Sequence, residues 1–382
     1  MAEKHLLDRL QIVRGNYGLT PWIEPRADES PLLRSWERSE AAGLEPADNV
    51  AFELVRRSVL AEIDDRHAAL IRMAKPETER LARALRLTDC SVLLVNAQAV
   101  IIDRLIDGSS ARKPLQAVSR KGVNLDEHCI GTTAPSIALT EGIPYLVGRD
   151  AHYAANNRGF FCVAAPIDDP LGQRIGALSI AAYESVPGFD VLSLVVHAAS
   201  AIENAFFSTE AQRLVIHFHA RAELVGTPME GILAIDGANR IVGVNRSACK
   251  LLCMARPALL GTDFNALMDF DLARHLSMRH AAPLSEMHSR SGLQLFVRLS
   301  NGTDGLPRAS GGMVAGAAFP PVQNLLKAAP IEANDTLRAA ELKLMKQALE
   351  QAGGNVTAAA RQLGISRSSI YRRLAEARDS GF

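Results

Sequence analysis

The stretch Gly353-Gly-Asn-Val-Thr-Ala-Ala-Ala-Arg-Gln-Leu-Gly-Ile-Ser-Arg-Ser-Ser-Ile-Tyr-Arg-Arg-Leu374 predicts two short helices joined by a tight turn. The two glycines at its start can end a preceding helix, because glycine accepts the left-handed backbone conformation that such an end requires. Asn355 is placed to cap a second helix, Val356 to Leu363, by accepting a hydrogen bond from a free backbone N–H. Gly364 provides the turn into a third helix. The pattern therefore predicts a small all-helical unit.

The third helix, predicted from Ser366 to Ala377, carries concentrated positive charge. Its first residue is a favourable N-cap, and Ile365 and Ile370 can form a hydrophobic staple across it. Over residues 361–378 the sequence has five arginines and one acidic residue. A glycine turn followed by a basic helix with a polar outer face is typical of a helix-turn-helix whose last helix enters the major groove of DNA.

The residues expected to contact DNA are the polar and basic ones on and beside this helix. They are Asn355, Thr357, Arg361, Ser366, Arg367, Ser368, Ser369, Tyr371, Arg372 and Arg373. An arginine can pair with guanine edges or with phosphates, and the sequence leaves both roles open for Arg367 and Arg372. The alternative interpretation is a helical hairpin with a merely solvated basic face. The coincidence of spacing, caps and charge favours DNA binding.

This segment resembles the C-terminal domain of the Fis family of bacterial regulators. The resemblance implies that the preceding helix, predicted from Leu337 to Ala352, forms a dimer interface. It also implies that the helix Ser366–Ala377 lies in the major groove. We therefore expect a homodimer that binds a two-fold symmetric site in double-stranded DNA.

The chain as a whole is neutral, with 42 Lys and Arg against 42 Asp and Glu among 382 residues. A neutral chain cannot coat nucleic acid over its whole surface, so DNA binding must be confined to one patch. No apolar stretch has the length and purity of a membrane span, and the charged N-terminus is unlike a signal peptide. The five cysteines are irregularly spaced, which argues against a disulfide framework or a zinc site. We expect a cytoplasmic protein with no membrane contact and no cofactor or metal.

Helix and strand patterns alternate from about Lys75 to Phe207. Strands are predicted at Ser91–Asn96, Val100–Leu105, Phe161–Ile167 and Arg174–Ala182, and a closing helix at Val191–Phe207. The turn-rich segment Asp168–Gln173 is expected to join the last two strands as a hairpin loop.

This region resembles a GAF domain of the kind found in activators of acetoin and glycerol catabolism. The match rests on Gly131–Pro144, Gly148–Tyr153 and Cys162–Gly172, with Leu33–Ser39 and Gly43–Pro46 upstream. The resemblance implies a small-molecule effector between the sheet and its covering loops, and a diol, a hydroxyketone or an aldehyde is the first candidate. Candidate effector-binding residues are His128, Cys129, His152, Tyr153 and Cys162. Each of them alone is more often a structural residue.

A second pattern of strand, turn and strand spans Gly231 to Asn245, and a helix is predicted over Arg246–Met254. This pattern resembles the opening of a PAS domain. Cys249 and Cys253 are four residues apart and would share a helix face, either as a redox pair or as two small buried residues.

Residues 301–331 contain five glycines and four prolines, a composition typical of a flexible linker. In the activators that the chain resembles, an ATPase domain of the AAA+ type occupies this place and needs a phosphate loop ending in Gly-Lys-Ser or Gly-Lys-Thr. The dipeptide Gly-Lys does not occur in this chain. We therefore expect neither ATP hydrolysis nor independent opening of sigma-54 promoters.

Together these patterns predict an α+β multidomain protein. The expected order is an N-terminal helical segment (1–74), a GAF-like α/β sensor (75–210), a PAS-like α/β domain (218–300), a flexible linker (301–331) and an all-α Fis-type helix-turn-helix (332–382). The predicted function is a sequence-specific transcriptional regulator that responds to a small molecule. An enzyme is the rival class, but no nucleophile elbow, phosphate loop or paired catalytic motif supports it. A third hypothesis is a dimerising co-regulator that modulates a full-length sigma-54 activator rather than binding DNA independently. RNA polymerase or a full-length activator is a further expected partner of the regulator.

Overall fold

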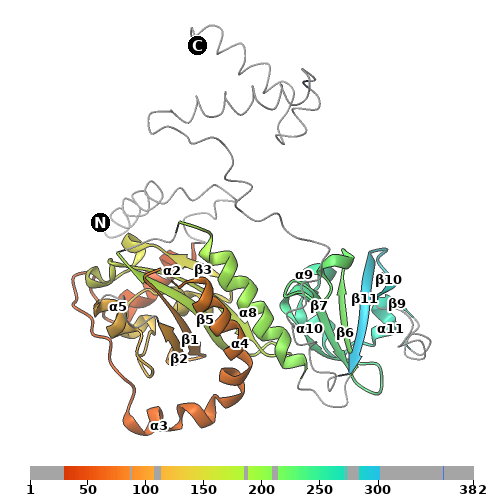
Figure 1. Ribbon diagram of the computed structural model, residues 1–382, viewed down its shortest axis with the longest axis horizontal. Coiled ribbons are helices and arrows are strands. Elements are labelled where there is room, and N and C mark those ends of the chain that lie inside the picture. The colour runs from red at the N-terminus through yellow and green to blue at the C-terminus, as the bar shows by residue number, and fades with distance from the viewer. Residues whose placement is uncertain are drawn as a thin grey trace. The chain divides into compact units, whose positions relative to one another are not determined.

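The structure is a computed structural model that describes residues 30–86, 88–106, 113–184, 188–208, 214–270, 272, 284–301 and 356. Its described residues form two antiparallel sheets that follow one another along the chain (Figure 1). We call the described part of residues 30–208 the first domain and that of residues 214–301 the second domain. The fold is thus a mixture of helix and sheet, as the sequence predicts.

The first domain is built on a five-stranded sheet. Its strands are β1 (Cys90–Asn96), β2 (Ile101–Ile106), β3 (Tyr145–Val147), β4 (Phe160–Asp168) and β5 (Arg174–Tyr183), in the order β2-β1-β5-β4-β3. The four strands predicted from the sequence are confirmed to within one residue at each end. The predicted hairpin is also confirmed, because β4 and β5 pair from Phe160 opposite Tyr183 to Asp168 opposite Arg174.

Both faces of this sheet are buried, which is why its strands are almost continuously apolar. Alternate side chains of each strand point to opposite faces. One core contains Leu93 of β1 and Cys162 of β4, whereas their neighbours Leu94 and Val163 belong to the other core. The sheet is therefore the middle layer of three.

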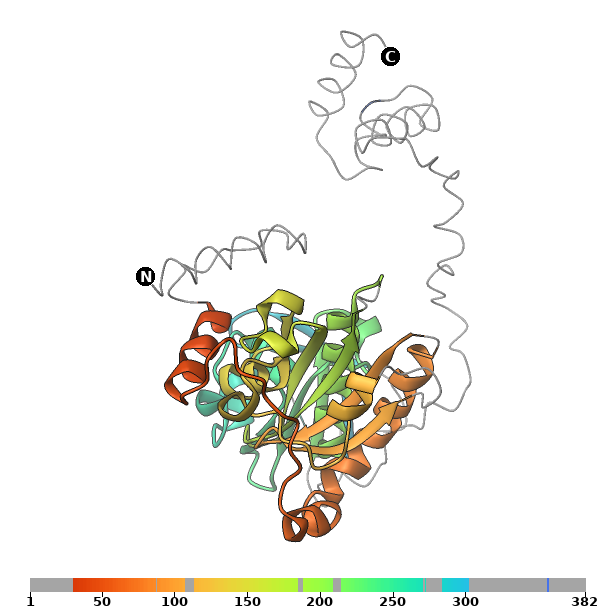
Figure 2. The same cartoon turned by 90° about the vertical axis from the view of Figure 1, so that its left-hand side faces the viewer.

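Helices cover the two faces of the first sheet differently. On one face lie α3 (Arg57–Arg66), α4 (Ala68–Ala84) and α8 (Val191–Phe207), and α4 packs against α8. The opposite face is covered by shorter pieces, which Figure 2 shows from the side. These are α2 (Pro31–Ala41), α5 (Lys113–Val118), α6 (Glu127–Ile130), α7 (Ala134–Glu141) and the 3-10 turns η2 (Arg149–Ala151) and η3 (Ala155–Asn157). The α8 bounds are those predicted.

The second domain contains a six-stranded sheet. Its strands are β6 (Leu214–His219), β7 (Gly231–Ile235), β8 (Ile241–Val244), β9 (Met268–Asp269), β10 (Ser285–Ser289) and β11 (Gln294–Asn301), in the order β8-β7-β6-β11-β10-β9. The accompanying helices are η4 (Ala222–Leu224), α9 (Arg246–Leu252), α10 (Arg256–Leu259) and α11 (Phe264–Leu267). The predicted strand, turn and strand from Gly231 are confirmed as β7 and β8.

Helix α9 ends two residues earlier than predicted, because Cys253 adopts a left-handed conformation with a φ of 52° and caps the helix. Cys253 is exposed and Cys249 is half-buried, and both are free thiols. The expectation that they share a helix face is therefore wrong at Cys253, which lies outside the helix.

The two domains meet at a group of charged residues that we call the charged contact: Asp168, Arg174, Glu203, Arg246 and Arg256. Asp168, at the end of β4, accepts hydrogen bonds from Arg174 Nε and Arg246 Nη2, both at 2.8 Å, and lies 3.3 Å from Arg256 Nη1. Glu203 of α8 accepts a hydrogen bond from the Asp168 backbone N–H at 2.9 Å and lies 3.5 Å from Arg246 Nη2. The second domain thus supplies two of the three arginines.

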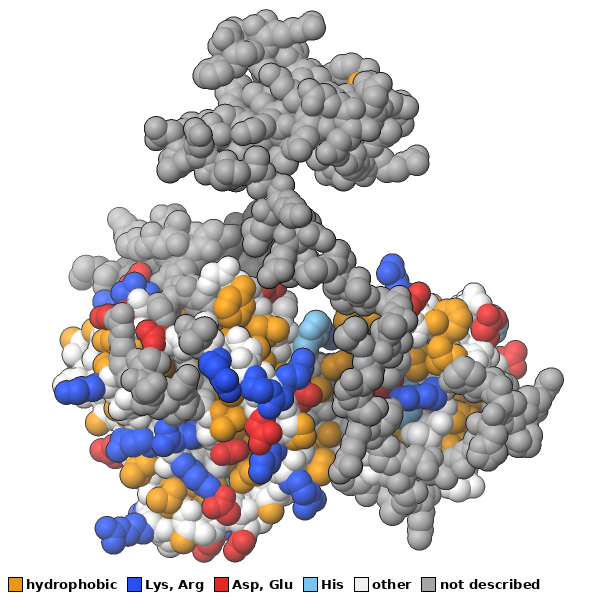
Figure 3. Space-filling model, viewed as in Figure 1, with side chains coloured by type: hydrophobic (Ala, Val, Ile, Leu, Met, Phe, Trp, Pro, Cys, Tyr) orange, Lys and Arg blue, Asp and Glu red, His pale blue; other side chains and the backbone are white. Residues whose placement is uncertain are grey.

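Among the described residues, none of the helices combines the length and apolar composition needed to cross a lipid bilayer. On the face drawn in Figure 3, acidic and basic side chains are interspersed over the described surface. The predicted helices Leu337–Ala352 and Ser366–Ala377 lie outside the described residues. Of the predicted helix Val356 to Leu363, the structure describes Val356 alone, which is helical, and the other residues lie outside the described part.

Candidate functional site

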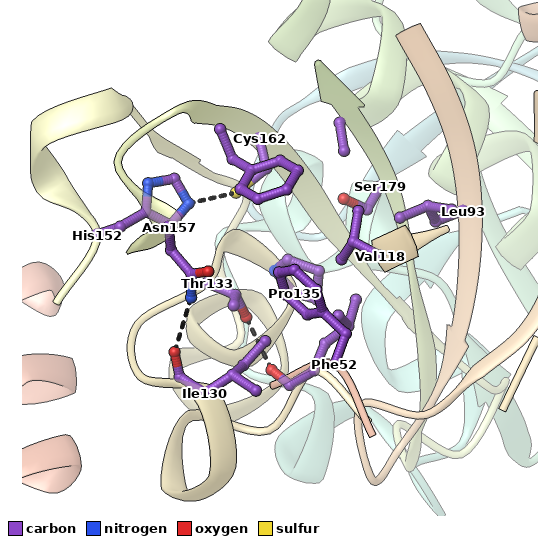
Figure 4. A pocket seen from close by; sticks show the side chains of 13 residues that line it. Phe52, Leu93, Val118, Ile130, Thr133, Pro135, His152, Asn157, Cys162 and Ser179 are labelled. Atoms are coloured by element: carbon purple, nitrogen blue, oxygen red, sulfur yellow. Dashed lines mark hydrogen bonds between the residues drawn. The ribbon is translucent and has the colours of Figure 1, made fainter. Parts of the chain in front are cut away.

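A cavity lies between the first sheet and the short segments that cover it (Figure 4). It offers about 30 Å³ to the centre of a water-sized sphere, roughly two to three times the space that one water needs. Its wall consists of Phe52, Leu93, Val118, Leu125, Ile130, Thr133, Pro135, His152, Asn157, Phe160, Cys162, Ser179 and Ala181. None of these side chains is acidic, Lys or Arg, so the cavity suits a small and largely apolar molecule.

The floor of the cavity is made by small side chains in the middle of the sheet. Cys162 of β4 lies opposite Ala181 of β5, and Ser179 of β5 lies opposite Leu93 of β1. Cysteine, alanine and serine at neighbouring positions leave a depression where larger residues would fill the space. The floor is therefore a direct consequence of three small residues on one face.

The N-terminal end of α7 forms part of the roof. Thr133 caps this helix by accepting a hydrogen bond from Ser136 N–H, and its hydroxyl donates to the Leu125 carbonyl at 3.0 Å. Gly131, with a φ of 77°, precedes the cap, and a side chain there would crowd Tyr153 at 3.2 Å. The turn into α7 is thus held against the neighbouring loop.

His152 and Cys162 form a buried pair on the wall. His152 Nδ1 lies 3.0 Å from the Gly148 carbonyl oxygen and 3.3 Å from that of Arg149, and carbonyls only accept, so Nδ1 carries the proton. The unprotonated Nε2 then faces Cys162 Sγ at 3.5 Å. The sulfur also accepts a hydrogen bond from Ala134 N–H.

Burial keeps both groups of this pair neutral. It lowers the pKa of His152 from 6.5 to about 4, against the raising effect of the two carbonyls. It raises the pKa of Cys162 from 9.0 to about 12, against the lowering effect of the Ala134 N–H. A thiol with so high a pKa is a poor nucleophile, since the thiolate is the reactive form, so Cys162 is suited to contact and shape rather than to covalent chemistry.

Asn157 is the polar residue of the wall with an unsatisfied atom. Its amide Nδ2 donates to the Ile130 carbonyl at 2.9 Å (Figure 4). Its Oδ1 is buried and has no hydrogen-bond partner. An acceptor left without a donor in a protein interior costs free energy, which makes this atom a natural point of contact for a bound molecule.

Helix α2 holds the roof segments together from outside. Trp36 is buried, and its indole N–H donates to the Ala151 carbonyl at 2.9 Å. Ser35 donates to Glu127 of α6 and Arg38 forms an ion pair with the same carboxylate. The segment upstream of the sheet therefore supports the loops that line the cavity.

The structure brings together two of the five candidate effector residues, His152 and Cys162. Tyr153 is buried next to them but packs against Trp36 and donates its hydroxyl hydrogen to the Leu44 carbonyl, so it does not line the cavity. His128 and Cys129 are exposed and lie outside the wall.

Sequence reasoning missed Phe52 and Asn157. Phe52 lies in a segment without regular structure, far from the sheet in the chain, so no periodicity marks it. Asn157 lies among the polar residues of a loop, where asparagine is an ordinary turn residue. Its side-chain partners could be found only from the fold.

The predicted DNA-contacting residues lie outside the described residues: Asn355, Thr357, Arg361, Ser366, Arg367, Ser368, Ser369, Tyr371, Arg372 and Arg373. Where the chain is described, no group of three or more His, Cys, Asp or Glu side chains is arranged to hold a metal ion.

Two family models match separate parts of the chain. Residues 336–376 match "Bacterial regulatory protein, Fis family". Residues 8–204, more than half of the chain, match "MimR, N-terminal domain". The second match includes every segment that lines the cavity.

Individual relatives are transcriptional or catabolism regulators by name. The acetoin catabolism regulatory protein of Cupriavidus necator is 28% identical over 285 residues, which are 71% of this chain and 43% of that protein. The propane 2-monooxygenase operon transcriptional activator MimR of Mycolicibacterium smegmatis is 27% identical over 293 residues, 75% of this chain and 46% of that protein. The chain thus spans less than half the length of these two relatives.

A solved structure, that of the Escherichia coli DhaR(N)–DhaL complex, aligns with a TM-score of 0.44 and 17% identity over 71% of this chain and 99% of the matched chain.

Proposed function

Because the chain belongs to the family that carries the MimR N-terminal domain, we propose that it is a DNA-binding transcriptional regulator controlled by a small neutral molecule in the cavity of the first domain. The observation that carries the proposal is this uncharged cavity, roofed and floored by residues of the family domain. The first domain would serve as a GAF-like sensor and the second as a PAS-like domain.

DNA binding is assigned to the Fis-family segment. Arg367 and Arg372 would read bases or hold phosphates from the last helix, and the helix Leu337–Ala352 would pair two chains. The two recognition helices of the homodimer would then lie about 34 Å apart, one turn of DNA.

The names of the relatives suggest where to search for the effector. One relative is a regulatory protein of acetoin catabolism and another is the activator of a propane 2-monooxygenase operon, so alcohols, diols, ketones and aldehydes of a few carbon atoms are the first compounds to test. All of these are neutral, as the wall of the cavity requires.

The chain would act without hydrolysing ATP. It has no Gly-Lys dipeptide and therefore no phosphate loop of the usual kind. A protein of this kind influences transcription by occupying DNA, or by acting together with a complete activator at shared sites.

The experiment combines a ligand screen with a cavity-filling variant. A ligand that binds the folded state raises its melting temperature by mass action, so the full chain is screened for compounds that do so. Ala181→Leu places a larger side chain in the cavity and should abolish the shift. Ala61→Leu, the same change at an exposed position of α3, should leave the shift intact.

DNA binding is tested on the same proteins with a native operator fragment. Arg372→Ala should weaken binding by about 1–3 kcal/mol if the side chain reads a base. Loss of ligand binding in Ala61→Leu as well, or full DNA affinity in both Arg367→Ala and Arg372→Ala, would contradict the assignment.

A second function, that of a co-regulator, follows from the absence of a phosphate loop. If the purified chain has no DNA affinity of its own but alters the activity of a full-length sigma-54 activator in a transcription assay, the co-regulator is the correct assignment.

A further inference from the structure

We infer that the ligand of the cavity is a small neutral alcohol whose hydroxyl donates a hydrogen bond to Asn157 Oδ1. This inference rests on the proposed function and makes it more specific, because it separates hydrogen-bond donors from ketones and aldehydes of the same size.

The identity of the free atom of Asn157 follows from its neighbour. The Ile130 carbonyl lies 2.9 Å from one end of the amide. A carbonyl oxygen can only accept, so the end that faces it must be the NH₂ group and the other end must be the oxygen. The unsatisfied buried atom on this wall is therefore an acceptor, and only a donor can satisfy it.

The hydroxyl and thiol groups of the wall are already engaged. The hydroxyl hydrogen of Thr133 is donated to the Leu125 carbonyl and that of Ser179 to the Val163 carbonyl. Cys162 faces the lone pair of His152 Nε2 and receives the Ala134 N–H. Thr133, Ser179, Cys162 and His152 therefore have no free hydrogen to donate to the carbonyl oxygen of a ligand.

The remaining wall excludes charged ligands. Its other members are apolar: Phe52, Leu93, Val118, Leu125, Ile130, Pro135, Phe160 and Ala181. An ammonium group would need a carboxylate here, and a carboxylate would need a cation, since an unpaired charge is costly in an apolar interior. A short hydrocarbon with one hydroxyl matches both parts of the wall.

Aldehydes and simple ketones fit the shape of the cavity but not its polarity. Their oxygen only accepts, so Asn157 Oδ1 would stay unpaired and a second buried acceptor would be added. Sites built to hydrogen-bond a hydroxyl discriminate strongly against analogues that lack it. The cavity should therefore bind an alcohol more tightly than the ketone or aldehyde that forms when this alcohol is oxidised.

The test measures binding of three compounds of similar size to the full chain, by thermal shift and by saturation-transfer NMR. The probes are sec-butanol, which donates, butanone, which only accepts, and isopentane, which does neither. We expect sec-butanol to bind about tenfold more tightly than either of the others, the size of one buried hydrogen bond.

The matched variants are Asn157→Leu, which removes the acceptor, and Asn156→Ala. Asn156 is exposed and bonds to Asn49 and Val50, away from the cavity. Asn157→Leu should bind the three compounds about equally, and Asn156→Ala should keep the preference for sec-butanol. If Asn157→Leu does not fold, the selectivity of the unchanged chain decides the inference.

The outcomes separate the inference from the proposed function. Equal binding of all three compounds to the unchanged chain overturns the preference for an alcohol and leaves the cavity as the ligand site. Retention of the preference in folded Asn157→Leu overturns the role of Asn157. If none of the three probes binds, the alcohol inference is overturned, whatever the ligand screen finds. The proposed function is contradicted by different results: a response of Ala181→Leu to a screening hit that equals that of the unchanged chain, or the outcomes given above for Ala61→Leu and the two arginine variants.

Discussion

The cavity lies within the first domain and the charged contact lies where the two domains meet, and different kinds of residue form them. The cavity wall has no ionic side chain, and its one unsatisfied atom is the Asn157 oxygen. In the charged contact, Asp168 is almost fully buried and has three arginines around it. A buried charge is tolerated only with such partners. The difference indicates that the cavity suits a neutral ligand, whereas the carboxylates of the charged contact are already paired with arginines of the protein. Arg256 Nε in the charged contact is nevertheless also buried without a hydrogen-bond partner.

Helix α7 touches both regions. At its start, Ala134 N–H donates to Cys162 Sγ on the cavity wall. After its end, the Gly142 carbonyl accepts a hydrogen bond from Arg246 Nη1 of the second domain at 2.7 Å. Arg174 Nη1 also donates to the Leu139 carbonyl of α7 at 2.6 Å. One short helix therefore lies between the cavity and the charged contact.

Removing the central carboxylate should have the largest effect on stability. Asp168→Asn keeps the shape of the side chain but leaves Arg174, Arg246 and Arg256 without their common anion. Breaking a buried ion pair on one side costs about 3–5 kcal/mol. Urea denaturation measures the loss. The control is Glu62→Gln in an exposed pair with Arg66, where a change within about 0.5 kcal/mol is expected. Equal effects of the two changes would show that the contact is not a buried ionic one.

Glu203 should make stability decrease with pH. Burial raises the pKa of Glu203 from 4.5 to about 7. Arg246, the hydrogen bond from the Asp168 N–H and Arg256 lower this pKa, and the Asp168 carboxylate raises it by less than its N–H lowers it. The folded state then binds more protons than the unfolded state between these values. The contribution of Glu203 to the free energy of unfolding is therefore full below pH 4.5 and is lost as the pH rises through 7.

Glu203→Gln removes this titration and keeps an oxygen that can accept from the Asp168 N–H. Above pH 7 the variant should be more stable than the unchanged chain, by on the order of 2 kcal/mol. Unfolding free energies at several pH values provide the measurement. A parallel pH dependence of the two proteins would rule out a raised pKa.

His152, on the wall of the cavity, should make stability increase with pH, the opposite of the effect of Glu203. Its pKa is lowered from 6.5 to about 4, so the unfolded state binds more protons between these values. Stability is full above pH 6.5 and is lost as the pH falls toward 4, by an amount similar to that for Glu203. His152→Asn keeps an N–H for the Gly148 carbonyl and should flatten the acid limb of the stability curve. An unchanged acid limb in this variant would place the effect elsewhere.

Cys162→Ala should have the smallest effect. The change removes one sulfur atom and its contact with Ala134 N–H, at a cost of about 1 kcal/mol. The enlarged cavity should bind an alcohol with one more methyl group more tightly than the unchanged cavity does. Cys253→Ala, at an exposed position, serves as the control and should alter neither stability nor ligand preference. A loss of all ligand binding in Cys162→Ala would show that the sulfur is a contact rather than part of the wall.

The strands of the first sheet could be predicted because their signal is local. A strand buried on both faces reads as a continuous apolar run, and β1, β4 and β5 begin and end within one residue of prediction. Among the candidate effector residues, His152 and Cys162 lie on the wall of the cavity, and their role in ligand binding stays a prediction. His128 and Cys129 were singled out on the same grounds but are exposed. The type of residue does not show which way its side chain faces.

The sequence by itself determined β1, β2, β4, β5, β7, β8 and α8, the β4–β5 hairpin and the Fis-type segment, because periodicity, caps and turn residues act over a few neighbouring positions. Only the tertiary structure decided that Asp168, in a segment expected merely to turn the chain, receives arginines from the second domain. It also decided that the Asn157 amide meets the Ile130 carbonyl and keeps its oxygen unpaired. These contacts join residues that are distant in the chain, and their energies depend on burial, which no local pattern encodes.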